Sequence, residues 1–162
     1  LDRPRNEKLI NEVRRAGARI KLIPDGDLSP AVAVAFEDSG VDVLAGIGGA
    51  PEGVLAAAAL RCVGGEMQAR LWPTSEAEAE RAKKMGIKDV RQKLVMDDLV
   101  RNDDVVFAAT GVTDGELLKG VYYSGHTART HSLVMRGATG TVRFIEALHR
   151  LDRKPELVKK GR

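Results

Sequence analysis

The sequence of 162 residues has few cysteines, few aromatic residues and no long hydrophobic run. Its one cysteine, Cys62, cannot form a disulfide within the chain, so we expect a reducing, cytoplasmic setting. Cys62 stands in an apolar segment and is expected to be a small buried side chain. No apolar run approaches the roughly 20 residues that span a bilayer, and no signal peptide opens the chain, so no membrane association is expected.

An excess of one charge sign is also missing, because 26 basic and 23 acidic residues give a formal net charge of +3. Basic residues are interspersed with acids, and only 4% of the residues are aromatic, which leaves few side chains to stack on bases. We therefore expect no nucleic-acid partner. A hydrophobic content of 43% with 30% charged residues is typical of an ordinary globular domain.

Helical and strand patterns alternate along the first two thirds of the chain. The predicted helices are 6–16, 31–37, 51–63, 75–85 and a short one at 114–120. The predicted strands are 18–24, 41–45, 66–72 and 104–110, followed by a hairpin of 130–136 and 141–150. Ser29, followed by Pro30, is expected to cap the helix at 31–37, and the polar tail from Asp152 is expected to fray. The pattern predicts one layered α/β domain, with a mostly parallel or mixed sheet flanked by helices and an antiparallel C-terminal hairpin.

Ligands of open α/β sheets collect beyond the carboxyl ends of the strands, where three loops qualify: 25–27, 46–53 and 110–115. The loop at 46–53, "GIGGAPEG", suggests a dinucleotide site at first. Pro51 replaces the third glycine of that fingerprint, however, and no acid follows the next strand, so a nucleotide-dependent oxidoreductase is disfavoured. In the loop at 110–115, Thr113 or Asp114 is expected to cap the following helix.

Glu52 has two interpretations. As an acid in the first turn of a helix it interacts favourably with the helix dipole, which stabilises by roughly 0.3–1 kcal/mol. Alternatively it binds a hard divalent cation such as Mg²⁺ or Mn²⁺, which would let phosphate oxygens share the site.

Two further groups are ambiguous in the same way. Asp25 with Gly26 suits a turn, yet Asp25 and Asp27 could also accept hydrogen bonds from sugar hydroxyls. Arg3 and Arg5 suit a phosphate monoester through charge-assisted bonds, or they are surface arginines without a role.

The segments "LDRPRNEKLI", "GARIKLIPDGDLS", "GIGGAPEGVLAAAALRCVGGEMQARL" and "ATGVTDGELLKGV" together resemble class II fructose-1,6-bisphosphatases. These are metal-dependent sugar-phosphate phosphatases with the lithium-sensitive phosphatase fold, which inositol monophosphatases share. The similarity runs from residue 1 to about residue 151, in the order and spacing of that family.

The resemblance implies roles for specific residues. Glu52 corresponds to a metal ligand, with Mn²⁺ or Mg²⁺ as the cofactor. The substrate-binding positions of the family correspond to Arg3, Pro4, Arg5, Asp25, Gly26, Asp27 and Gly49. Arg3 departs mildly from the lysine common at its position. The other metal carboxylates and the threonine associated with the attacking water belong to an N-terminal half that has no counterpart here, so catalytic residues are expected outside this chain.

The resemblance thus predicts that residues 1–162 are the C-terminal domain of an enzyme that hydrolyses the 1-phosphate of fructose 1,6-bisphosphate, a step of carbohydrate metabolism such as gluconeogenesis. Its partners would be the sugar bisphosphate, the missing N-terminal half and further copies of itself in a homo-oligomer. Two alternatives stay open: a phosphosugar-binding module without catalysis, and an enzyme that also accepts sedoheptulose 1,7-bisphosphate.

Overall fold

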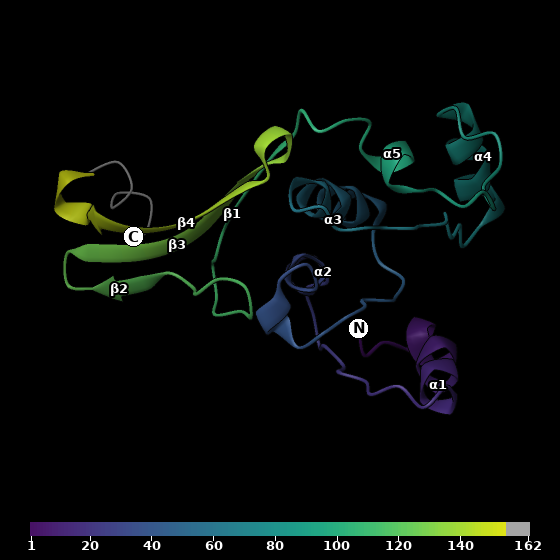
Figure 1. The fold of residues 1–162 in the computed structure, drawn as a ribbon, viewed down its shortest axis with the longest axis horizontal. Helices are drawn as coiled ribbons and strands as arrows, with labels where there is room; N and C mark the ends of the chain where they lie inside the picture. The colour runs from purple at the N-terminus through teal and green to yellow at the C-terminus, as the bar shows by residue number, and fades with distance from the viewer. Residues whose placement is uncertain (155–162) are drawn as a thin grey trace.

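The computed structural model describes residues 1–154, in which helices gather at one end of a long, curved antiparallel sheet (Figure 1). The α-helices are α1 (Glu7–Arg15), α2 (Leu28–Ala33), α3 (Ala50–Cys62), α4 (Glu76–Lys84) and α5 (Met96–Leu99). Short 3-10 turns are η1 (Pro4–Asn6), η2 (Glu37–Ser39), η3 (Gly137–Thr139) and η4 (Leu151–Arg153). The expected α/β class is confirmed. The tail expected to fray lies mostly outside the described residues.

Four strands form the sheet: β1 (Val106–Thr110), β2 (Tyr122–Ser124), β3 (Thr127–Arg136) and β4 (Thr141–Arg150). β4 pairs with β3 over its whole length, while β1 and β2 both pair with the other edge of β3, toward its opposite ends. The β3–β4 connection passes through η3 and closes at Gly140, whose φ of 59° favours glycine. The predicted C-terminal hairpin is therefore confirmed, since alternating residues and a glycine turn specify it.

The core lies where α3 packs between α2 and the sheet. Its fully buried residues come from all three elements: Val32 from α2, Ala59 and Cys62 from α3, and Phe107, Leu133 and Met135 from the sheet. The buried position expected for Cys62 is confirmed, with 1% of the residue exposed. A smaller cluster of Ala57, Leu60 and Met96 joins the other side of α3 to α5.

The expectation of a mostly parallel sheet is wrong for residues 1–154, where every strand pairing is antiparallel. The segments 18–24 and 41–45 are without strand pairing, and 66–72 makes one isolated bridge, between Ala69 and Leu94. A parallel sheet needs helices on both of its faces. The crossovers here carry short helices such as the six-residue α2, and only α3 is long enough to cover the strands beside it.

Two local predictions also fail. The segment 114–120 forms a loop, in which the Asp114 carboxylate accepts a hydrogen bond from the Gly120 N–H at 2.9 Å. Seven residues, two of them the glycines Gly115 and Gly120, are too few to nucleate a helix that has no packed face. Ser29 lies inside α2, whose N-cap is Asp27, so the helix begins earlier than predicted.

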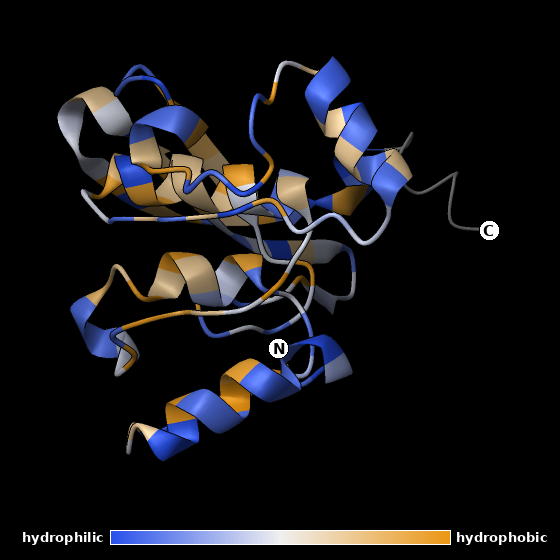
Figure 2. Cartoon of the chain, turned by 90° about the vertical axis from the view of Figure 1, so that its right-hand side faces the viewer, coloured by the Kyte–Doolittle hydropathy of each residue, from blue (hydrophilic) through white to orange (hydrophobic). Residues whose placement is uncertain are grey.

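The two polar helices match their predictions. α1 begins after Asn6, and its residues Leu9, Ile10 and Val13 are half-buried on one side of an otherwise hydrophilic helix (Figure 2). α4 is capped by Ser75, whose hydroxyl accepts a hydrogen bond from the Glu78 N–H at 3.3 Å. In the described part of the chain, no helix has the length and apolarity required to cross a membrane.

Candidate functional site

The glycine loop, residues 46–49, is the point at which most of the predicted site residues meet. It directly precedes α3, and Gly49 is the N-cap of that helix with an extended backbone, φ −69° and ψ 145°. Glu52 follows in the first helical turn, as predicted. Its carboxylate is therefore placed where the helix dipole favours negative charge, and both interpretations of Glu52 agree with this position.

Residues of η1 hold the glycine loop through the backbone of Ile47. Arg5 donates from Nε to the Ile47 carbonyl at 2.8 Å, and Asn6 accepts the Ile47 N–H at its Oδ1 at 3.0 Å. The Asn6 side chain also donates from Nδ2 to the carbonyl of Leu1 at 2.9 Å, and only 1% of Asn6 is exposed. Within residues 1–154, the Nη atoms of Arg5 have no hydrogen-bond partner, so they remain available to an anion.

Two acidic side chains lie against the glycines of the loop. A methyl group on Gly49 would lie 3.0 Å from Cδ of Glu52, and one on Gly48 would lie 3.4 Å from Cγ of Asp27, with a carboxylate oxygen closer in each case. Glycine at both positions therefore leaves room for a carboxylate directly over the backbone. Arg5, Asp27, Gly49 and Glu52 thus meet at one loop, although they come from three separate parts of the sequence.

The remaining predicted residues lie beside this group. Asp25 is highly exposed and accepts a hydrogen bond from the Gly26 N–H at 2.9 Å, as in the turn that its sequence favours. Arg3 approaches Asp25, with 3.9 Å between Nη2 and Oδ1. Arg3 and Pro4 line a pocket of about 380 Å³ that is shared with Ile10 and Arg14 of α1.

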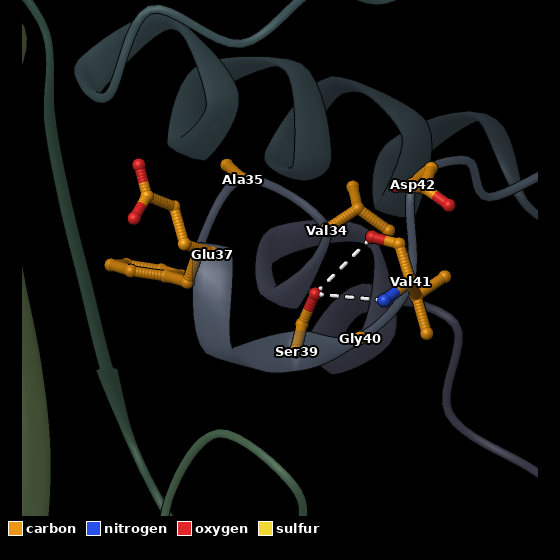
Figure 3. A pocket seen from close by; sticks show the side chains of 8 residues that line it. Val34, Ala35, Glu37, Ser39, Gly40, Val41 and Asp42 are labelled. Atoms are coloured by element: carbon orange, nitrogen blue, oxygen red, sulfur yellow. Dashed lines mark hydrogen bonds between the residues drawn. The ribbon is translucent and has the colours of Figure 1, made fainter.

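A second pocket, of about 270 Å³, is lined by residues 34–37 and 39–42, just before the glycine loop. Figure 3 shows the Ser39 hydroxyl bonded to both the N–H and the carbonyl of Val41, at 3.2 Å each. These bonds close the turn at Gly40, whose φ is 64°. None of the predicted site residues lines this pocket.

Glu52 is the residue that the resemblance predicts as a metal ligand, and its carboxylate lies against Gly49 in the first turn of α3. In the part of the chain that the structure describes, no group of three His, Cys, Asp or Glu side chains could enclose an ion. Hard cations take six or more oxygen ligands, several of them from the protein or from substrate phosphates. Glu52 could therefore supply one ligand of a metal site, and the other ligands would have to come from outside the described residues.

Apolar side chains are exposed on both sides of the glycine loop. Val43 and Leu44 precede it with 75% and 37% exposed, and Val54 and Leu55 follow it with 47% and 48% exposed. Single exposed apolar residues are ordinary, so these four are notable only because they flank the same loop.

The significant residue that the sequence did not reveal is Asn6. Asparagine directly after Arg-Pro-Arg looks like a helix cap, and it precedes α1, but its side chain makes no capping hydrogen bond. Its two partners, Leu1 and Ile47, are backbone groups. Backbone partners leave no trace in residue types, so the sequence carried no signal for this role of Asn6.

Comparison with known proteins gives a consistent result. A model of the family described as bacterial fructose-1,6-bisphosphatase, glpX-encoded, matches residues 1–149. The fructose-1,6-bisphosphatase class 2 of Haemophilus influenzae is 44% identical over 94% of this chain and 49% of its own length. A protein named D-fructose 1,6-bisphosphatase class 2/sedoheptulose 1,7-bisphosphatase, from Synechococcus sp. strain JA-3-3Ab, is 43% identical over 94% of this chain and 47% of its own length. The chain spans about half the length of the curated relatives that it matches.

Proposed function

The chain belongs to the family of bacterial glpX-encoded fructose-1,6-bisphosphatases, and we propose that it forms the C-terminal, substrate-binding half of such an enzyme. The reaction is hydrolysis of the 1-phosphate of fructose 1,6-bisphosphate, which releases fructose 6-phosphate and inorganic phosphate. The observation that carries the proposal is the meeting of Arg5, Asp27, Gly49 and Glu52 at one glycine loop.

Substrate is held by charge and by hydrogen bonds from this chain. Arg5 is fixed through Nε and offers its two Nη groups to a phosphate, while Arg3 and Pro4 shape the wall beside it. Asp25, Gly26 and Asp27 receive the sugar hydroxyls. The Gly49 backbone approaches the substrate closely because no side chain stands in the way.

Glu52 holds the cation, Mn²⁺ or Mg²⁺, from the helix end of the loop. When bound, the cation supplies Lewis acidity toward the phosphate oxygens. Glu52 contributes one anionic oxygen ligand and, by its place in the first turn of α3, keeps that ligand oriented toward the loop. The groups that activate the attacking water are expected in the other half of the enzyme.

The N-terminal half of the enzyme is the partner that completes the site. One carboxylate cannot hold a hard cation firmly, and the apolar residues Val43, Leu44, Val54 and Leu55 offer a surface for that half to cover. The 162-residue chain alone is therefore expected to be inactive. The full enzyme is expected to form homo-oligomers in the cytoplasm, a reducing setting that suits the single buried thiol of Cys62.

A second substrate, sedoheptulose 1,7-bisphosphate, is favoured by the name of the Synechococcus relative, which is 43% identical to this chain. Both sugars are ketose bisphosphates that differ by one hydroxymethylene unit. One pocket that recognises the 1-phosphate and the neighbouring hydroxyls can accept both.

The experiment is a chimera in which this chain replaces the matching half of the Haemophilus influenzae relative. We expect phosphate release from fructose 1,6-bisphosphate that depends on Mn²⁺ or Mg²⁺, with no release from fructose 6-phosphate. A folded chimera that binds the bisphosphate without hydrolysing it would favour the non-catalytic binding module instead. Failure to bind or hydrolyse any sugar bisphosphate would refute the proposed function.

A further inference from the structure

Asn6 connects the arginine turn to the glycine loop. Its amide reaches two backbone groups that are 46 residues apart in sequence, the Leu1 carbonyl at 2.9 Å and the Ile47 N–H at 3.0 Å. Only 1% of Asn6 is exposed, and among residues 1–154 it is the one charged or polar residue that is buried. A buried amide in this position is retained only because its hydrogen bonds are made.

Arg5 and Asn6 bind opposite sides of the same residue. The Ile47 carbonyl accepts from Arg5 Nε at 2.8 Å, while the Ile47 N–H donates to Asn6. Ile47 stands between Gly46 and Gly48 in a loop that has little conformational restraint of its own. The orientation of this loop, and with it the placement of Gly49, therefore depends on the two side chains of η1.

We propose that Asn6 is a positioning residue of the substrate site: it fixes the glycine loop against the Arg3–Arg5 turn and so sets the distance between the phosphate-binding arginine and the loop that carries Gly49 and Glu52. This role rests on the proposed function of the site. Asn6 touches neither substrate nor metal in this arrangement. It acts through Ile47, and through Ile47 on Arg5. The orientation of the free Nη groups of Arg5 depends on Ile47, because Arg5 Nε donates to the Ile47 carbonyl.

The role predicts a specific kinetic signature. Replacing Asn6 by Ala leaves the Ile47 N–H without its acceptor and frees the loop from the turn. In the chimera, the Asn6→Ala variant is expected to raise the KM for fructose 1,6-bisphosphate about tenfold or more, with a much smaller fall in kcat at saturating metal. A purely structural asparagine would lower the thermal midpoint and leave the KM, measured well below that temperature, unchanged.

Two variants serve as controls. Asn6→Asp has the same shape and keeps the oxygen that accepts the Ile47 N–H, while it loses the donor to Leu1. Its KM is expected to lie closer to that of the unsubstituted chimera than the KM of Asn6→Ala does. Gln92→Ala removes an exposed amide side chain from the loop before α5 and is expected to leave the KM unchanged.

Amide hydrogen exchange gives a measurement that needs no activity. Protection of the Ile47 N–H is expected to fall at least about tenfold in Asn6→Ala, and to persist in Asn6→Asp and Gln92→Ala. If the Ile47 amide loses protection but the KM does not rise, or if Asn6→Asp and Asn6→Ala raise the KM equally, the positioning role is overturned. Absence of hydrolysis by the unsubstituted chimera would instead count against the proposed function, so the two failures are distinct.

Discussion

Substitution of Gly49 by alanine separates the site's function from the stability of the fold. The new methyl group would lie 3.0 Å from Cδ of Glu52 and closer to its Oε2, whereas ordinary van der Waals contact begins at 3.4 Å. The obstructing atoms belong to the far end of a flexible side chain, so the carboxylate can move away. A displacement of roughly 1 Å at a reacting site costs about 10²-fold in rate, and we expect kcat/KM of the chimera to fall by about that factor.

Stability should respond very little to the same change. Gly49 has φ −69° and ψ 145°, which alanine adopts without strain. The reduced freedom of the unfolded chain stabilises by about 0.4–1 kcal/mol, and the poorer helix-capping preference of alanine offsets a similar amount. The net change in the free energy of unfolding is therefore expected within about 1 kcal/mol.

The assay compares metal-dependent phosphate release and thermal unfolding in Gly49→Ala and in Gly53→Ala. Gly53 is the matched control, because a methyl group there meets only Met67 Cε at an unstrained 3.9 Å. Alanine at Gly53, inside α3, should stabilise by about 0.5–1 kcal/mol and leave activity unchanged. If Gly49→Ala retains full activity, the space over this glycine is not needed by the Glu52 carboxylate, and the assignment of Glu52 fails with it.

Three other substitutions and treatments have clear expected outcomes. Glu52→Gln in the chimera should reduce activity by orders of magnitude with little change in the thermal midpoint. The control Glu66→Gln, at an exposed position beyond α3, should change neither the activity nor the midpoint. Near-normal turnover of Glu52→Gln at saturating Mn²⁺ would instead favour the helix-dipole explanation. In binding titrations, Arg5→Ala should weaken binding of the bisphosphate more than binding of fructose 6-phosphate, because charge-assisted hydrogen bonds to phosphate are stronger than neutral ones. Equal losses for the two ligands would show that Arg5 does not contact the phosphate. Burial raises the pKa of the Cys62 thiol, so the thiol should stay unreactive toward Ellman's reagent at pH 8 until the chain unfolds. Rapid labelling of the folded chain would contradict the core described above.

The elements that the sequence predicts well are those defined by local pattern. The hairpin of β3 and β4 follows from alternating residues around a glycine turn, and α4 follows from Ser75 with its charged helical segment. The placement of Glu52 in the first turn of α3 follows from the glycine loop and Pro51 before it. Each of these depends on residues close together in the chain, for which propensity and spacing are informative.

Features that depend on distant partners could not be predicted in the same way. The segments 18–24 and 41–45 have the composition of strands, but a strand forms only when it pairs with another strand. Residue composition does not predict which strand that partner is. Thr113 or Asp114 was expected to cap a helix, and Asp114 instead closes a loop onto Gly120. Asn6 acts on backbone groups of Leu1 and Ile47, a relation visible only in three dimensions.

The site residues stay predictions from the resemblance, and only the structure shows how they are arranged. Family resemblance identified Arg5, Asp27, Gly49 and Glu52, and the structure brings them to one loop. It also leaves Asp25 exposed in a turn, 3.9 Å from Arg3 at the nearest charged atoms. An exposed pair of this kind contributes little to stability, so both side chains are free to reorganise around a ligand.

The central claim is that these 162 residues hold half of an active site, and phosphate release by the purified chain tests it most directly. With fructose 1,6-bisphosphate and saturating Mn²⁺, the chain alone is expected to release no phosphate, because Glu52 is its one predicted metal ligand and the described residues hold no group of three side chains that could enclose an ion. Addition of the N-terminal half of the Haemophilus influenzae relative in trans is expected to produce metal-dependent release, which Glu52→Gln abolishes. Steady phosphate release by the 162-residue chain without any partner would contradict the half-site account.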